Sequence, residues 1–103
     1  MGLKRLRLFN NELRSDGFQA IAAIISESNL LELDLGGNEA TVGDMLTLLR
    51  SIRTSVRMSL TVLEIGANET NMEVEEEINR IKEVYPHLDI ARDRARLPAA
   101  DAS

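Results

Sequence analysis

Few residues in this sequence could carry out catalysis. Among its 103 residues there is one histidine, His87, and there is no cysteine. This composition excludes most pairs of a nucleophile and a base, as well as thiolate zinc sites and disulfides. Gly36-Gly37-Asn38 lacks the following Lys and Ser/Thr of a phosphate-binding loop. We therefore expect a protein that is not an enzyme and that has no cofactor and no metal site.

The charge and hydropathy of the chain limit its partners. It carries 12 Lys and Arg residues against 17 Asp and Glu, a formal net charge of −5, so phosphate backbones and anionic lipids attract it little. Residues 1–8 alternate apolar and charged side chains, unlike a signal peptide. No apolar run approaches the roughly 18 residues of a membrane span. These features predict a soluble, cytoplasmic protein whose partner is another protein, not nucleic acid or a membrane.

One short pattern recurs along the chain. It reads L-x-x-L-x-[LI]-x-x-N, and it starts at Leu3, Leu30 and Leu60. A degenerate fourth copy has these residues at the same four offsets: Tyr85, Leu88, Ile90 and Asp93. The spacing allows one strand and one helix per unit, and such units bury a shared core only when several of them stack.

This pattern resembles the leucine-rich repeat, and its longer ribonuclease-inhibitor-like class in particular. The first unit also has the residues with which that class continues into its helix: Asn11, Leu13, Gly17, Ile21 and Ile25. The resemblance implies an α/β fold, a short right-handed β-α superhelical solenoid with parallel strands on the concave face and helices on the convex face. We expect a repeat domain over residues 1–95, with about three full repeats and a degenerate fourth strand, and a disordered tail over residues 96–103.

The resemblance also assigns a role to the asparagines. Asn11, Asn38 and Asn68 are expected to form an asparagine ladder that satisfies backbone groups in successive turns. Asp93 departs from the pattern, because a carboxylate cannot donate a hydrogen bond as an amide does.

Three helices are expected between the strands. The first is capped by Ser15 or Asp16 and has apolar residues at helical spacing: Phe18, Ile21, Ala22 and Ile25. The second runs over about residues 42–55, with these residues facing inward: Met45, Leu48, Leu49 and Ile52. The third opens with a capping box over residues 70–73, and its apolar stripe consists of Val74, Ile78, Ile81 and Val84.

Side chains between the leucines would point away from the helices and form columns across the sheet. The first column consists of Arg5, Glu32, Val62 and His87. The second consists of Arg7, Asp34, Glu64 and Asp89. The third consists of Phe9, Gly36, Gly66 and Ala91. The first two columns are the candidate protein-binding residues.

Two interpretations of the charged columns stay open. Arg5 with Glu32, and Arg7 with Asp34, can form ion pairs between strands, each worth roughly 0–1 kcal/mol. Alternatively, the three acids of the second column must be screened by solvent or by a basic patch on a partner, with the two arginines setting the register. In that case, reversing the charge of the last two acids weakens binding without unfolding the domain.

Other features also have a structural and a functional interpretation. Gly36 and Gly66 either serve the turn after each strand or leave the backbone open to a partner. His87 is either an ordinary exposed side chain or part of a groove with pH-dependent affinity. A helical stripe of basic residues is either a solvated face or a second docking site: Arg50, Arg53 and Arg57.

The sequence favours a protein–protein interaction module that binds its partner on the concave face. One alternative is a GTPase-activating or regulatory protein of the Ran-activator type, with these loop residues available for contact: Asn10, Asn11, Glu12 and Arg14. Another is a structural terminal segment of a larger leucine-rich-repeat scaffold, cytoskeletal or axonemal. Self-association through the N-terminal edge, which has no obvious polar cap, also stays open.

Overall fold

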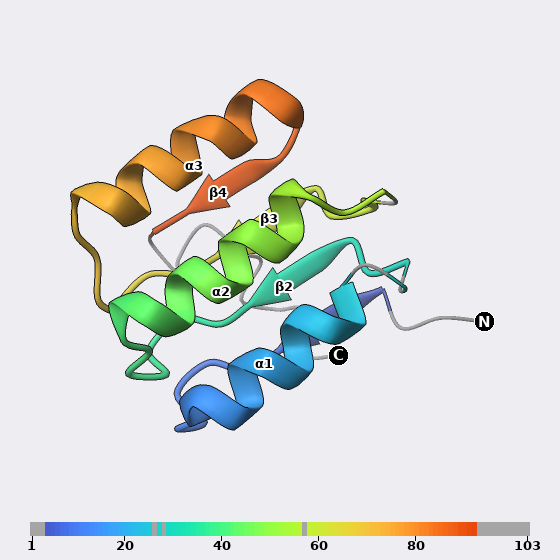
Figure 1. Cartoon of the computed structure of the whole chain (residues 1–103). Helices are drawn as coiled ribbons and strands as arrows, with labels where there is room; N and C mark the ends of the chain where they lie inside the picture. The colour runs from blue at the N-terminus through green and yellow to red at the C-terminus, as the bar shows by residue number, and fades with distance from the viewer. Residues whose placement is uncertain (1–3, 26, 28, 57, 93–103) are drawn as a thin grey trace.

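Strands and helices alternate along the whole described part of the chain (Figure 1). The computed structural model describes residues 4–25, 27, 29–56 and 58–92. Its elements are β1 (Arg5–Arg7), α1 (Arg14–Ile25), β2 (Glu32–Asp34), α2 (Val42–Arg53), β3 (Val62–Glu64), α3 (Met72–Val84) and β4 (Asp89–Ala91). The predicted α/β class is confirmed. Four features with sequence predictions lie outside the described residues: Leu3, Arg57, Asp93 and the tail over residues 96–103.

The strands form one parallel sheet in the order β1-β2-β3-β4, and the three helices lie on one face of it (Figure 1). Successive side chains in a strand point to opposite faces. Leu6, Leu33, Leu63 and Ile90 are aligned in register and point toward the helices. The opposite face carries the side chains that alternate with them.

The register of β4 differs from the prediction. The pattern aligns Leu88 with Leu63, but the structure pairs Ile90 with Leu63, a shift of two residues. Leu88 still belongs to the turn after α3, where its N–H donates to Tyr85 O at 3.0 Å, and the Asp89 N–H then donates to Thr61 O at 2.9 Å. Leu88 therefore precedes the strand. As a result, Asp89, Ile90 and Ala91 each lie in a different column from the predicted one.

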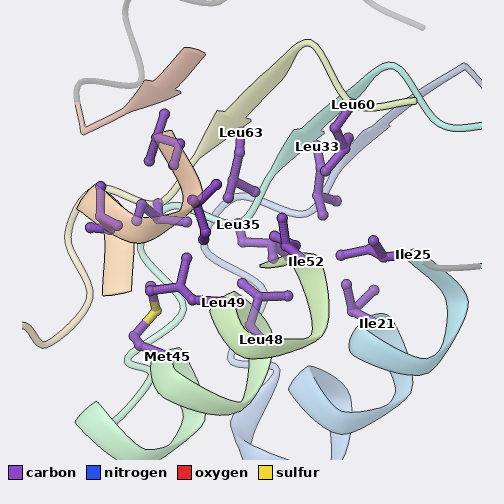
Figure 2. Close-up of a cluster of buried hydrophobic side chains, with 14 of the residues drawn as sticks. Ile21, Ile25, Leu33, Leu35, Met45, Leu48, Leu49, Ile52, Leu60 and Leu63 are labelled. Carbon is purple, nitrogen blue, oxygen red and sulfur yellow. The ribbon is translucent and has the colours of Figure 1, made fainter. Parts of the chain in front are cut away.

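A continuous and largely aliphatic core fills the space between the sheet and the helices (Figure 2). Leu33 and Leu63 are fully buried, and they point from the strands toward side chains of α1 and α2 in Figure 2. The predicted inner faces of α1 and α2 are confirmed, with these residues buried: Phe18, Ile21, Ala22, Ile25, Met45, Leu48, Leu49 and Ile52. Leu6 and Leu8 of the first unit are only half-buried.

The inner face of α3 was predicted only in part. Val74, Ile78 and Ile81 are buried, but Val84 is 51% exposed. A carboxylate, Glu77, is buried on this helix at 1% exposure. Hydrophobicity at helical spacing therefore identified three of the inward residues and overlooked the charged one.

The helix starts also depart from the prediction. The capping box belongs to α2, where the Thr41 side chain accepts from the Asp44 N–H and the Asp44 side chain accepts from the Thr41 N–H. In α3 the cap is Asn71, whose Oδ1 accepts from the Val74 N–H at 2.9 Å; Thr70 lies one residue before it. α1 already begins at Arg14, so Ser15 and Asp16 lie inside its first turn. In the described part of the chain no helix has the length and apolar composition needed to cross a membrane.

Candidate interaction face

The sheet face without helices presents side chains in two aligned rows. The outer row consists of Arg5, Glu32, Val62 and Asp89, and the inner row consists of Arg7, Asp34, Glu64 and Ala91. The first three members of each row were predicted in their correct places. The fourth members were wrong, because β4 is shifted: Asp89 stands beside Val62 and not beside Glu64, and His87 lies in the turn before the strand, exposed.

The two rows differ sharply in accessibility. In the outer row Arg5 is exposed, and the other three side chains are half-buried. In the inner row Asp34 is 1% exposed and Glu64 and Ala91 are fully buried. Solvent therefore does not screen Asp34 and Glu64, which was one of the two possibilities open for these acids. The outer row is the accessible part of the face.

Each buried acid folds back onto its own strand end. Asp34 Oδ1 accepts from the Gly36 N–H at 3.0 Å, and Glu64 Oε2 accepts from the Gly66 N–H at 2.8 Å. In both units the acid is followed two residues later by glycine, and this repeated spacing is the signal from which the contact could have been predicted. These hydrogen bonds help to explain how a carboxylate tolerates burial, since a buried charge needs partners.

Ion pairs connect β1 with β2. Arg5 Nε lies 3.3 Å from Glu32 Oε1, which confirms the predicted pair. Arg7 Nη2 lies 3.9 Å from the same oxygen. Glu32 therefore faces both arginines, a sharing that one-to-one alignment of the columns did not predict.

The glycines after the strands serve close packing of the chain and do not leave the backbone open. A Cβ on Gly36 would lie 3.3 Å from the Phe9 ring and from Gly66 O. A Cβ on Gly66 would lie 2.3 Å from Arg92 O, which leaves no room for any side chain. Of the two interpretations, the structural one holds at these positions.

Asn38 and Asn68 connect successive strand-to-helix loops as predicted, whereas the Asn11 side chain donates to Phe9 O of its own unit at 3.1 Å. Asn38 Oδ1 accepts from the N–H groups of Asn11 and Leu13, at 2.7 and 3.4 Å. Asn68 Oδ1 accepts from the N–H groups of Asn38 and Ala40, at 3.1 and 2.9 Å.

The amide nitrogens of the same side chains link the loops through carbonyl groups. Asn38 Nδ2 donates to Leu8 O at 2.7 Å, and Asn68 Nδ2 donates to Leu35 O at 2.9 Å. Each amide thus accepts from and donates to the preceding unit, a dual role that an ionised carboxylate cannot fill.

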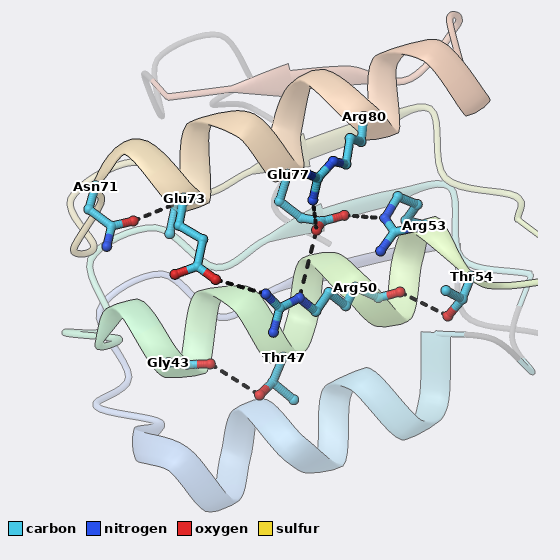
Figure 3. A network of polar contacts seen from close by, with 10 residues as sticks. Gly43, Thr47, Arg50, Arg53, Thr54, Asn71, Glu73, Glu77 and Arg80 are labelled. Carbon is cyan, nitrogen blue, oxygen red and sulfur yellow. Dashed lines mark hydrogen bonds and ion pairs between the residues drawn. The ribbon is translucent and has the colours of Figure 1, made fainter.

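The predicted basic stripe on α2 is engaged with α3 (Figure 3). Arg53 forms a short hydrogen-bonded ion pair with buried Glu77, and Arg50 Nε and Arg80 Nη1 lie 3.7 and 3.5 Å from the other oxygen of that carboxylate. Arg50 Nη2 also contacts Glu73 Oε2 at 3.0 Å. Arg50 and Arg53 therefore join two helices.

Among the described residues no group of three or more His, Cys, Asp or Glu side chains could hold a metal ion.

The chain matches no model of a known protein family, and no curated protein matches it.

Proposed function

We propose that this chain is a leucine-rich-repeat domain of the ribonuclease-inhibitor-like class, folded as a short solenoid. We further propose that it binds another protein through the sheet face without helices, called the strand face below. The repeat assignment is supported by the aligned leucines and by the amide bridges of Asn38 and Asn68. The binding role is carried by one observation. The outer row presents charged and apolar side chains of four adjacent strands on the face opposite the helices.

The outer row favours a partner with basic groups near β4 and an acidic group near β1. Arg5 stands at one border, and Asp89 stands at the other beside the apolar Val62. Charges arranged this way fix the register of a partner more than they raise its affinity. We place this role in the cytoplasm, which the cysteine-free sequence supports, and we assign no catalytic step to it.

The test is charge reversal at Asp89. Glu64 is unsuitable, because a lysine at a fully buried position would disturb folding. Asp89→Lys, wild type and the control Glu76→Lys, on the exposed outer side of α3, are compared in a pull-down read by mass spectrometry. The expected partner is captured by wild type and by the control but not by Asp89→Lys. The dissociation constant of the purified partner then rises about tenfold for Asp89→Lys; an unchanged constant refutes the proposed face.

Each of two alternative functions is supported by one observation. Asn10 and Glu12 in the β1–α1 loop and Arg14 at the start of α1 are exposed, as a GTPase-regulating contact would need. A GTPase-stimulation assay separates this role from passive binding. The half-buried Leu6 and Leu8 of β1 support a structural role in a larger scaffold, or self-association. Concentration-dependent sedimentation tests the latter.

A further inference from the structure

A small pocket lies beside the loop between β3 and α3, away from the strand rows. Its volume is about 210 Å³. Met45, Val74 and Ile78 contribute apolar side chains to it, and Asn68 and Thr70 line its polar side. We call it the β3–α3 pocket. Its lining combines apolar side chains with backbone groups that can form hydrogen bonds.

The polar side of this pocket repeats an arrangement that the chain uses twice elsewhere. In the first unit the N–H groups of Asn11 and Leu13 donate to one amide oxygen, and in the second those of Asn38 and Ala40 do so. The equivalent pair in the third unit is Asn68 N–H and Thr70 N–H. Within the described residues these two groups donate no hydrogen bond.

A matching acceptor lies in the same pocket. The carbonyls of Leu8 and Leu35 each receive the amide N–H of an asparagine from the next unit, at 2.7 and 2.9 Å. The equivalent carbonyl is that of Ile65, which lines the pocket and receives only the amide of its own unit, Asn68, at 3.2 Å among the described residues. Two donors and one acceptor fit one group that both accepts and donates. In the other two units that group is a primary carboxamide.

The rim of the pocket is held by an ion pair. Arg92 donates two hydrogen bonds to Glu75, at 2.8 and 2.6 Å, and Thr70 Oγ1 donates to the same carboxylate at 2.6 Å. Because the Arg92 charge is neutralised there, the pocket has no surplus positive charge with which to attract a carboxylate ligand.

We propose that the β3–α3 pocket binds the side-chain carboxamide of an asparagine carried by a partner polypeptide. The amide oxygen accepts from Asn68 N–H and Thr70 N–H, and the amide nitrogen donates to Ile65 O. Asn38 lies five residues after Leu33, and Asn68 lies five residues after Leu63. The residue five places after Ile90 in the sequence is Ala95. Alanine has no such amide. This site is independent of the strand face, so each proposal can fail alone.

The test uses peptides and NMR spectra of the full chain. The probe is an end-blocked peptide Leu-Gly-Gly-Asn-Glu-Ala, which copies residues 35–40, and its controls replace the asparagine by aspartate or alanine. We expect saturable shifts of the Asn68 and Thr70 amide signals with the asparagine peptide. The alanine peptide should bind about tenfold or more weakly, the factor expected when hydrogen bonds to backbone groups are lost. The aspartate peptide should also bind less tightly.

Two chain variants form a matched pair. Thr70→Val and Thr70→Pro both lose the hydroxyl contact with Glu75, but only proline removes the backbone N–H. Thr70→Val should bind the probe as wild type does, and Thr70→Pro should not. If Thr70→Pro does not fold, the comparison of the three peptides decides alone. Asp89→Lys should leave the probe shifts unchanged.

Three results overturn the proposal. The first is the absence of saturable shifts at Asn68 and Thr70, and the second is equal affinity for the three peptides. The third is a concentration-dependent shift of the same signals without peptide that disappears in Asn11→Ala, because the occupant would then be a second copy of the chain.

Discussion

Asn38 shows how much one side chain can do in a turn between two stacked units. It is fully buried, its oxygen accepts two N–H groups of the first unit, and its nitrogen donates to Leu8 O, Leu35 O and Gly36 O. Leaving buried backbone groups without partners costs about 1–3 kcal/mol for each group. The position is therefore expected to contribute far more to stability than an exposed asparagine.

We predict that Asn38→Ala lowers the free energy of unfolding by about 3 kcal/mol. Asn11→Ala is the control, because Asn11 is exposed and its amide makes one hydrogen bond to the residues that the structure describes, at Phe9 O; a loss below about 1 kcal/mol is expected there. Urea unfolding followed by circular dichroism measures both. Equal losses for the two variants would show that the buried hydrogen bonds of Asn38 stabilise the fold no more than the exposed one of Asn11.

A second residue-scale prediction concerns Glu75. Hydrogen bonds from Arg92 and then from Thr70 lower the pKa of this carboxyl below its ordinary value of 4.5. A lowered pKa in the folded state means that the charged carboxylate stabilises the fold above pH 4.5, and that this contribution is lost as pH falls through the folded-state pKa. Arg92→Gln should raise the pKa of Glu75 in a carboxyl NMR titration and reduce the loss of stability on acidification. A pKa that stays low in the variant would assign the shift to other groups.

At the scale of elements, α2 and α3 are joined by charge as well as by apolar contact. Buried Glu77 faces three arginines, of which Arg53 and Arg50 come from the neighbouring helix. The outer pair of Arg50 and Glu73 is about half exposed on both sides. Exposed pairs contribute little, whereas removal of one partner of a buried pair is costly.

We predict that Glu77→Gln lowers the free energy of unfolding by about 2 kcal/mol, because the arginines stay partly solvated when the buried charge is lost. Glu73→Gln should cost less than about 0.5 kcal/mol. A double-mutant cycle with Arg53→Met should then give a coupling energy for Glu77 above that for Glu73. If both glutamines cost the same, the buried contact is not an energetic link between the helices.

Much of the arrangement of elements could be predicted from the leucines, and the reasons for the failures are local. Alternating Leu, together with apolar residues at helical spacing, placed β1, β2, β3 and the inner faces of α1 and α2 correctly. Leu88 was assigned to the wrong place because periodicity does not reveal how many residues a turn after Pro86 uses. Glu77 was missed because an inward carboxylate depends on arginines of another helix. The burial of Asp34 and Glu64 was not predicted, because alternation gives the face of a side chain but not its accessibility.

At the scale of the whole molecule, the described parts of the units share one core. The buried cluster extends from Phe18 of α1 to Ile81 of α3 and Ile90 of β4, and Tyr85 Oη donates to Ser55 O across the connections of two units, at 2.5 Å. Units that share their apolar contacts and backbone hydrogen bonds in this way are expected to unfold together.

This continuity predicts a single unfolding transition. Tyr85 is the only tyrosine and there is no tryptophan, so its fluorescence reports the third unit while circular dichroism reports all helices. The two denaturation curves should coincide. Leu33→Ala should lower the free energy of unfolding by about 3 kcal/mol and shift the midpoints of both curves equally. Curves that separate would mean that the units melt in turn. A monomer that unfolds in one step would argue against a purely structural segment that needs neighbours.

The crowding at Gly66 has a consequence for how this chain can vary. A methyl group there would meet a carbonyl oxygen of the backbone, whereas at Gly43, in α2, the nearest atom to an added methyl is the Thr41 hydroxyl at 3.8 Å. In a library of all single substitutions, position 66 should therefore accept glycine alone, while position 43 should accept many residues and gain helix propensity from alanine. An alignment of homologues should therefore show glycine throughout at position 66 and various residues at position 43.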